Sequence, residues 1–331
     1  MKLPYAHWLL CAFALCGASS ALAHHSVAFY SPDKIELAGE ITSIQWQNPH
    51  IRFELRTVGA GGVPKVWQLE SSSIFLREKD GVTRDLFHVG DAVRVYGRPS
   101  PHDASALLVT NMLLPDGREA PLWPQTPPHF VGMDRWITTT PTLVDAAAEN
   151  RGIFRVWRPN QQASLAALPY TEAAVAARRS FDMLAAATRC GPEGMPRIMM
   201  TLFPYEFVDR GTELLVRTEL YDTERVIHMD RTAPPPGEPH SVLGYSVGAW
   251  QGDVLVIDTS LVNWPYLDQI GTPLSEDVQV VERYALSDDQ TRLDVEITIT
   301  DAGTFTGPAV VKNSWFAYGD TLRRYDCQNG D

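Results

Sequence analysis

The chain has 331 residues and a formal net charge of −12 at pH 7, and 44% of its residues are hydrophobic. An acidic protein of this kind repels phosphate backbones and anionic membranes, so nucleic acid is not an expected partner. The length exceeds what one hydrophobic core usually supports and therefore predicts two domains.

The first stretch, MKLPYAHWLLCAFALCGASSALA, is typical of an export signal. It has one lysine near its start, an apolar region, and a small-x-small end at Ala21-Leu22-Ala23 that fits signal peptidase. The apolar region is too short for a stable membrane anchor. Cys16 raises a lipoprotein alternative, but the bulky Leu15 beside it is a poor context for lipid attachment. We therefore predict a signal peptide over 1–23, a periplasmic or secreted location, and no stable membrane insertion after cleavage.

Residues 24–120 predict a small OB-like β-barrel. IRFELRT alternates apolar and charged residues, which is the period-two pattern of a strand with one solvated face. KVWQLE, DAVRVYG and ALLVTNMLL supply further strands, and SSSIFLREKDG supplies a short helix between them. About five short strands with one helix midway is the pattern of a small, partly open barrel.

Residues 121–150 predict a linker, because PLWPQTPPHF is too rich in proline for a helix or a central strand. The second domain, 151–331, opens with a helix in PYTEAAVAARRSFDMLAAATRCGP, where Thr171 can act as the N-cap. About seven or eight strand candidates follow residue 195, which indicates a lipocalin-like barrel or a sandwich. The fold class is therefore mainly β, with one helix in the larger domain.

Removal of the signal leaves Cys190 and Cys327 as the cysteines of the mature chain. Two cysteines in an oxidising compartment usually pair. We predict a disulfide between them, with a stabilisation of ~4 kcal/mol in the loop-entropy model.

The mature chain begins with paired histidines, and a third histidine follows in the turn QNPH. A terminal histidine chelates a metal ion through its amine and its imidazole. His24 would provide this chelate, and His50 or His25 the second imidazole of the nitrogen-rich site that tetragonal Cu(II) favours. The arrangement resembles the copper site of lytic polysaccharide monooxygenases and of periplasmic copper carriers. The structural alternative is a solvated terminus and a histidine that only hydrogen-bonds within a turn.

A second group of titratable residues lies in the later strands: Glu219, Arg225, His228, Asp230, Asp258, Glu282 and Arg283. Carboxylates and a histidine that converge inside a barrel would have the shifted pKa values that general acid–base catalysis requires. The catalytic candidates are His228, Asp230, Glu282 and Arg225. In the alternative reading Glu282 and Arg283 form an ion pair at a strand edge. Trp250, Trp264 and Tyr266 are candidates for a ligand pocket at the barrel mouth, or for core positions.

The sequence contains no G-x-S-x-G elbow, P-loop, Gly-rich dinucleotide fingerprint or H-E-x-x-H motif, so no nucleotide cofactor is expected. Copper or another divalent transition metal is the cofactor that the histidines indicate.

Both halves resemble uncharacterised bacterial families. HHSVAFY, LAGEITSIQWQNPH and ALLVTNMLLPDGRE resemble a family of small exported proteins with paired terminal histidines and an Asn-Pro-His turn, positions held here by His24, His25 and His50. CGPEGMPRIM, ELYDTERVIHMDR and GYSVGAWQGDVLVIDTSLVN resemble a secreted β-rich domain of soil bacteria. That domain often reads Pro-His-Ser-Glu where this chain has Pro273-Leu274-Ser275-Glu276, which argues against histidine chemistry in that loop. The resemblances support the domain boundaries and imply no reaction.

These observations favour a periplasmic metal-associated binding protein with a pocket for a small, largely apolar ligand. One alternative is a secreted barrel enzyme, a hydrolase, lyase or isomerase acting on a small hydrophobic substrate, or a copper-dependent oxidase. Another is a structural envelope protein. The expected partners are a metal ion or a small molecule.

Overall fold

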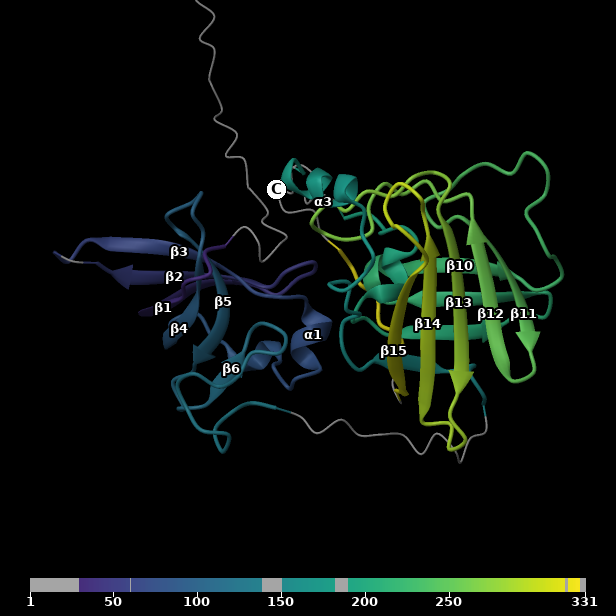
Figure 1. The fold of residues 1–331 in the computed structure, drawn as a ribbon. Helices are drawn as coiled ribbons and strands as arrows, with labels where there is room; N and C mark the ends of the chain where they lie inside the picture. Colours follow the sequence, from purple (N-terminus) through teal and green to yellow (C-terminus); the bar gives the residue numbers. More distant parts are fainter. Residues whose placement is uncertain (1–29, 60, 139–150, 182–189, 319–320, 328–331) are drawn as a thin grey trace, which may run out of the picture.

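The computed structural model describes residues 30–59, 61–138, 151–181, 190–318 and 321–327. Within them the chain forms two β-barrels that lie side by side (Figure 1). The predicted fold class is confirmed, since a small barrel is followed by a larger one. In the described part of the chain, no helix is long and apolar enough to cross a membrane.

The first barrel closes in the order β1-β2-β3-β5-β4 and back to β1. Its strands are β1 (Ile35–Gln45), β2 (Arg52–Val58), β3 (Pro64–Glu70), β4 (Ala92–Pro99) and β5 (Ala106–Leu113). Neighbouring strands are antiparallel except β3 and β5, whose parallel pairing closes the barrel. Helix α1 (Ile74–Glu78) follows β3, the short helix η2 (Arg84–Leu86) precedes β4, and strand β6 (Glu119–Pro121) extends the sheet beside β5.

Alternation along the strands builds the core of this barrel. In β2, Phe53 and Leu55 are buried while Arg56, on the other face of the strand, is exposed, as the period-two pattern predicts. Strong curvature brings backbones close at Gly97, where a Cβ atom would lie 2.3 Å from the carbonyl oxygen of Leu108. Glycine at this position therefore permits the bend through which β4 pairs with β5.

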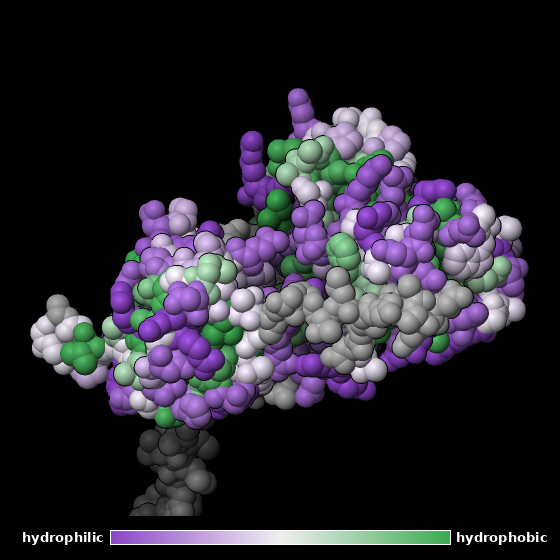
Figure 2. All heavy atoms as spheres, turned by 90° about the horizontal axis from the view of Figure 1, so that it is seen from below, coloured by the Kyte–Doolittle hydropathy of each residue, from purple (hydrophilic) through white to green (hydrophobic). Residues whose placement is uncertain are grey.

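The hairpin of β2 and β3 projects beyond the barrel and carries apolar side chains at its tip. Val58 and Val63 are 74% and 67% exposed. Figure 2 shows this tip as a small hydrophobic patch on a largely hydrophilic surface. Isolated exposed apolar side chains are ordinary on soluble domains.

The second barrel contains nine strands. They close in the order β10-β11-β12-β13-β14-β15-β7-β8-β9. Their bounds are β7 (Val156–Pro159), β8 (Tyr205–Asp209), β9 (Glu213–Thr218), β10 (Thr223–His228), β11 (Tyr245–Gln251), β12 (Val254–Ser260), β13 (Gln279–Leu286), β14 (Arg292–Thr300) and β15 (Ala309–Ala317). An odd number of strands cannot alternate in direction all the way round, and the parallel pair here is β10 with β11.

Aromatic side chains fill the interior of this barrel. Trp157, Tyr205, Tyr284 and Trp315 are almost completely buried. The rings of Tyr205 and Trp315 stack at 4.3 Å with an interplanar angle of 8°. The interior of the barrel is therefore a packed core around these four rings. The remaining helices are α3 (Glu172–Arg179), capped by the hydroxyl of Thr171, and the short helices η3 (Arg197–Met200) and η4 (Leu220–Asp222).

The two barrels are joined by helix α1 and by the C-terminal segment. In Figure 1, α1 lies on the side of the small barrel that faces the larger one. Its Phe75 ring contacts Phe203 at 5.6 Å between centroids. The predicted disulfide between Cys190 and Cys327 is present, with a Cα–Cα distance of 5.8 Å. It fixes the C-terminal segment next to the small barrel, because Cys327 forms a β-bridge with Asn48.

Candidate functional site

The Asn-Pro-His turn lies between β1 and β2, at the end of the small barrel that faces the C-terminal segment. Asn48 is buried, and its side-chain amide both donates and accepts a hydrogen bond. Its Nδ2 donates to the carbonyl of Tyr325 at 2.5 Å, and its Oδ1 accepts from the N–H of Ile74 at 3.1 Å. The side chain therefore connects this turn to the start of α1 and to the second domain.

His50 is held by the strand end beside it. Its Nδ1 lies 2.8 Å from the carbonyl oxygen of Ser71 and 3.5 Å from Oε1 of Glu70. Because a carbonyl oxygen only accepts, Nδ1 carries the proton, and in the neutral ring the lone pair is then on Nε2. Metal-binding histidines are commonly oriented in this way, by a carbonyl or carboxylate on the other ring nitrogen.

The other two predicted metal ligands, His24 and His25, lie outside the described residues. In the described part of the chain, no group of three or more His, Cys, Asp or Glu side chains is arranged to hold a metal ion. Tyr30, six positions after His24, is buried on the small barrel. Burial, followed by the charge of Glu70, raises the pKa of the Tyr30 phenol. The N-terminal end of the described chain is therefore close to the edge that carries Glu70 and His50.

The catalytic candidates of the larger barrel separate into two places. Arg225 and Glu282 meet in the interior, with 2.5 Å between Nη2 and Oε2. Arg225 also donates to Ser246 and Thr259, and Tyr284 donates to the second oxygen of Glu282 at 2.6 Å. These groups form a buried, hydrogen-bonded ion pair. Arg283 faces the other side of β13 and donates to Gln251.

His228 and Asp230 do not join this cluster. His228 stacks on the ring of Tyr245 at 4.5 Å, and its Nδ1 lies 3.5 Å from Glu213. Asp230 is about half exposed and lies beside Arg231. The strand alternation that the sequence displays explains the separation, since residues 225 and 228 point to opposite faces of β10.

The three aromatic candidates for a ligand pocket also have different surroundings. Trp250 is 44% exposed at the end of β11. Trp264 packs on the backbone of Gly194, where a Cβ would lie 2.3 Å from the indole. Tyr266 contacts Phe181 at 4.8 Å between centroids. Neither of the two cavities described here is lined by any of the three.

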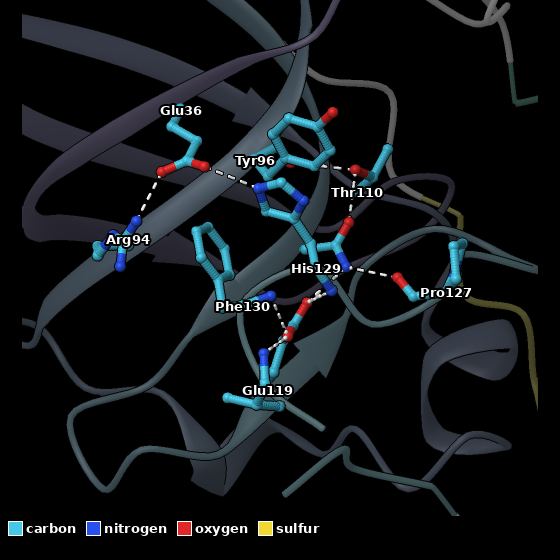
Figure 3. Close-up of polar contacts among 10 residues, drawn as sticks. Glu36, Arg94, Tyr96, Thr110, Glu119, Pro127, His129 and Phe130 are labelled. Atoms are coloured by element: carbon cyan, nitrogen blue, oxygen red, sulfur yellow. Dashed lines mark hydrogen bonds and ion pairs between the residues drawn. The ribbon is translucent and has the colours of Figure 1, made fainter. Parts of the chain in front are cut away.

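A polar cluster that the sequence did not indicate fixes the first part of the predicted linker 121–150, called the connector below, on the small barrel (Figure 3). The buried carboxylate of Glu119 accepts hydrogen bonds from the backbone N–H groups of His129, Phe130 and Val131, at 2.7 to 3.0 Å. It also accepts one from Asn111 at 2.6 Å. A single side chain therefore satisfies three successive donors of a loop that the proline content had suggested to be a linker.

This loop in turn positions the ring of His129. The ring stacks on Tyr96 with 3.6 Å between centroids, and its Nε2 lies 2.8 Å from Glu36 (Figure 3). The hydrogen bond from His129, followed by that from Arg94, lowers the pKa of Glu36. These side chains are partly exposed and pair with one another, so the arrangement stabilises the connector.

A cavity of about 250 Å³ lies at the junction of the barrels. It is lined from the small barrel by Trp46, Gln47, Asn48, Ile74, Phe75 and Glu78, and from the larger domain by Glu219, Arg323, Arg324, Tyr325 and Asp326. A second hollow, of about 520 Å³, lies on the outside of the larger barrel and is lined mainly by polar side chains, including Arg283, Glu296 and Lys312.

Comparison with known proteins adds a family for part of the chain. A family model described as a family of unknown function, DUF6152, matches residues 13–107. The match covers the second half of the predicted export signal and the small barrel as far as the start of β5. No curated protein matches the chain significantly. The family similarity is therefore to proteins without an assigned activity.

Proposed function

We propose that this is an exported, periplasmic metal-associated protein that binds a divalent transition metal ion, copper in preference, through His24 and His50, with His25 beside them. The observation that carries the proposal is the hydrogen bond from Nδ1 of His50 to the Ser71 carbonyl, at 2.8 Å. It fixes the tautomer and the orientation in which Nε2 would serve as the metal ligand.

The setting of His50 supports this role. The His50 side chain is 14% exposed, so the ring is held within the turn. Glu70, with Oε1 3.5 Å from Nδ1, places a second acceptor oxygen beside that nitrogen, in addition to the Ser71 carbonyl. A carbonyl or carboxylate on one nitrogen and a metal on the other is a recurrent pattern at metal sites.

The chain length available to His24 also supports it. Tyr30 is six positions after His24, and an extended chain of that length spans at most about 20 Å. Tyr30 is close enough to Glu70 for its pKa to respond to that charge. His24 is therefore within reach of the edge at which His50 lies.

Two further observations are consistent with an exported protein. The Cys190–Cys327 disulfide requires an oxidising compartment in most organisms. The small-x-small end of the first stretch predicts a new amino terminus at His24.

Calorimetric titration of the processed protein with Cu(II) tests the proposal. We expect stoichiometric binding, and at least about tenfold weaker binding by His50→Ala and by a form with Gly-Ser added before His24. The exposed His88→Ala variant is the matched control, since His88 is 72% exposed on the same barrel. Equal affinity of the His50 variant and the parent protein would remove His50 from the site.

A further inference from the structure

The cavity between the barrels has apolar walls and one deeply buried acid. Phe75 and Tyr325 are 5% and 3% exposed, and both rings pack on Phe203. Trp46 packs between the cavity and Phe87 of the small barrel. These three rings line the cavity from both domains, so a ligand inside it would contact aromatic faces on more than one side.

Glu219 lines this cavity, just before η4, and is 4% exposed. The backbone N–H of Arg323 donates a hydrogen bond to its carboxyl group. Burial raises the pKa of Glu219 to about 7.

The arginines that line the cavity already have carboxylate partners. Arg323 pairs with Glu78, and Arg324 lies 3.4 Å from Asp222. The hydrogen-bond donor to Glu219 is therefore a backbone N–H, while the guanidinium groups of the two arginines pair with other carboxylates. The charged groups that face it are Arg323, which favours its ionised form, and Glu78 and Asp222, which oppose ionisation, while Arg324 and Asp326 complete the lining.

We propose that this cavity binds a small organic cation, an amine with a compact apolar body, whose ammonium group is held by Glu219 and whose body packs on Trp46, Phe75 and Tyr325. Carboxylates and aromatic faces together are the usual receptor for such cations. The volume of about 250 Å³ is below the ~300–1,000 Å³ of sites for drug-sized ligands, which restricts the ligand to a small amine. The net charge of −12 also attracts cations. This site is independent of the metal site.

The proposal has a pH signature. A cation binds to ionised Glu219, so a proton must leave the carboxyl group when binding occurs at or below neutral pH. For a group that titrates near pH 7, binding should be about tenfold tighter at pH 8 than at pH 6. The amine probe keeps its charge over that range, so the change reports on the protein.

Calorimetry with benzylamine and its neutral analogue benzyl alcohol tests the proposal on the full, disulfide-bonded chain. We expect benzylamine to bind, to release a proton near pH 6.5, and to bind at least about tenfold more tightly than benzyl alcohol. Glu219→Gln should remove that preference and the pH dependence. Glu224→Gln, which changes an exposed acid on the outside of β10, should change neither.

Equal binding of the two probes would overturn the cation assignment, and so would a preference that survives Glu219→Gln. Absence of binding by both probes would overturn the site itself. Should Glu219→Gln not fold, the proton release of the parent protein decides: the same heat in buffers of different ionisation enthalpy contradicts the proposal. Loss of Cu(II) binding in the separate titration leaves this result unaffected.

Discussion

The side-chain amide of Asn48 donates to the backbone carbonyl of Tyr325 at 2.5 Å, across 277 positions of sequence. The same side chain accepts from the N–H of Ile74, where α1 begins. Asn48 of the Asn-Pro-His turn thus connects the two domains, while His50, two residues later, contacts the carbonyl of Ser71. The turn therefore has a structural role at Asn48 and a proposed chemical role at His50, two residues later.

Asn48→Ala should lower the free energy of unfolding by about 1–3 kcal/mol, because it leaves buried partners at Tyr325 and Ile74 unsatisfied. Urea unfolding followed by fluorescence measures the change. Gln45→Ala, at the exposed end of β1, is the control and should stay within about 0.5 kcal/mol of the parent protein. A similar midpoint for all three proteins would contradict the role assigned to Asn48.

Removal of one member of the buried ion pair should be far more harmful than removal of both. Glu282→Gln leaves the Arg225 charge in the barrel interior without a counterion, and should destabilise the protein by about 3–5 kcal/mol. The double variant Arg225→Met with Glu282→Leu should recover much of this loss in the same unfolding measurement. If the double variant were as unstable as the sum of the single variants, the pair would not be coupled.

Glu119→Gln tests the loop that positions His129. The amide retains one acceptor oxygen and turns its N–H₂ group toward backbone donors, so the loss should be about 1–3 kcal/mol. Hydrogen exchange at the amides of residues 129–131 should become faster than elsewhere in the small barrel. Glu40→Gln, which breaks an exposed pair with Arg56, is the matched control and should cost at most about 1 kcal/mol. Unchanged exchange at residues 129–131 would contradict the role of Glu119 as the hydrogen-bond acceptor of this loop.

Glu219 should make stability depend on pH in a defined direction. Its pKa is about 7 in the folded protein, above the ordinary value of 4.5, so the folded state retains a proton that the unfolded state has lost. The contribution of Glu219 to the free energy of unfolding is therefore fully present below about pH 4.5. It decreases by up to about 3 kcal/mol as the pH rises to about 7.

The variant Glu219→Gln isolates this term, since a neutral amide does not titrate. The stability of the variant relative to the parent should increase between pH 5 and pH 8. A difference that stays constant over this range, measured by urea unfolding at each pH, would show that Glu219 titrates normally.

Local patterns predicted the strands and the disulfide well. Strand alternation can be read from a short stretch of sequence, and the disulfide follows from the number of cysteines in the mature chain. The pattern of Phe53 and Leu55 identifies β2, and the two mature cysteines identify the disulfide. The choice between a barrel and a sandwich stayed open, because it depends on β7. Only four residues, Val156–Pro159, close the larger barrel between β15 and β8, and such a nonlocal pairing has no local signal.

In the candidate sites, too, local patterns were predictable and contacts between distant segments were not. Alternation along β10 puts Arg225 and His228 on opposite faces, so the two cannot converge as the list of catalytic candidates assumed. The partner of Arg225 is Glu282, from a strand far along the chain, whereas the sequence suggested Arg283 for Glu282 because the two are adjacent. The junction cavity was not predictable, since Trp46, Glu219 and Tyr325 meet only when the C-terminal segment lies between the barrels. For His129, the one local signal was a polar residue within a proline-rich stretch.

The most direct measurement is the metal content and N-terminal sequence of the protein purified after export to the periplasm of a Gram-negative host. Our account predicts a chain that begins at His24 and carries about one copper ion, with clearly less in the His50→Ala variant. A chain that begins at another residue and contains no transition metal, or equal copper in the two proteins, would contradict it.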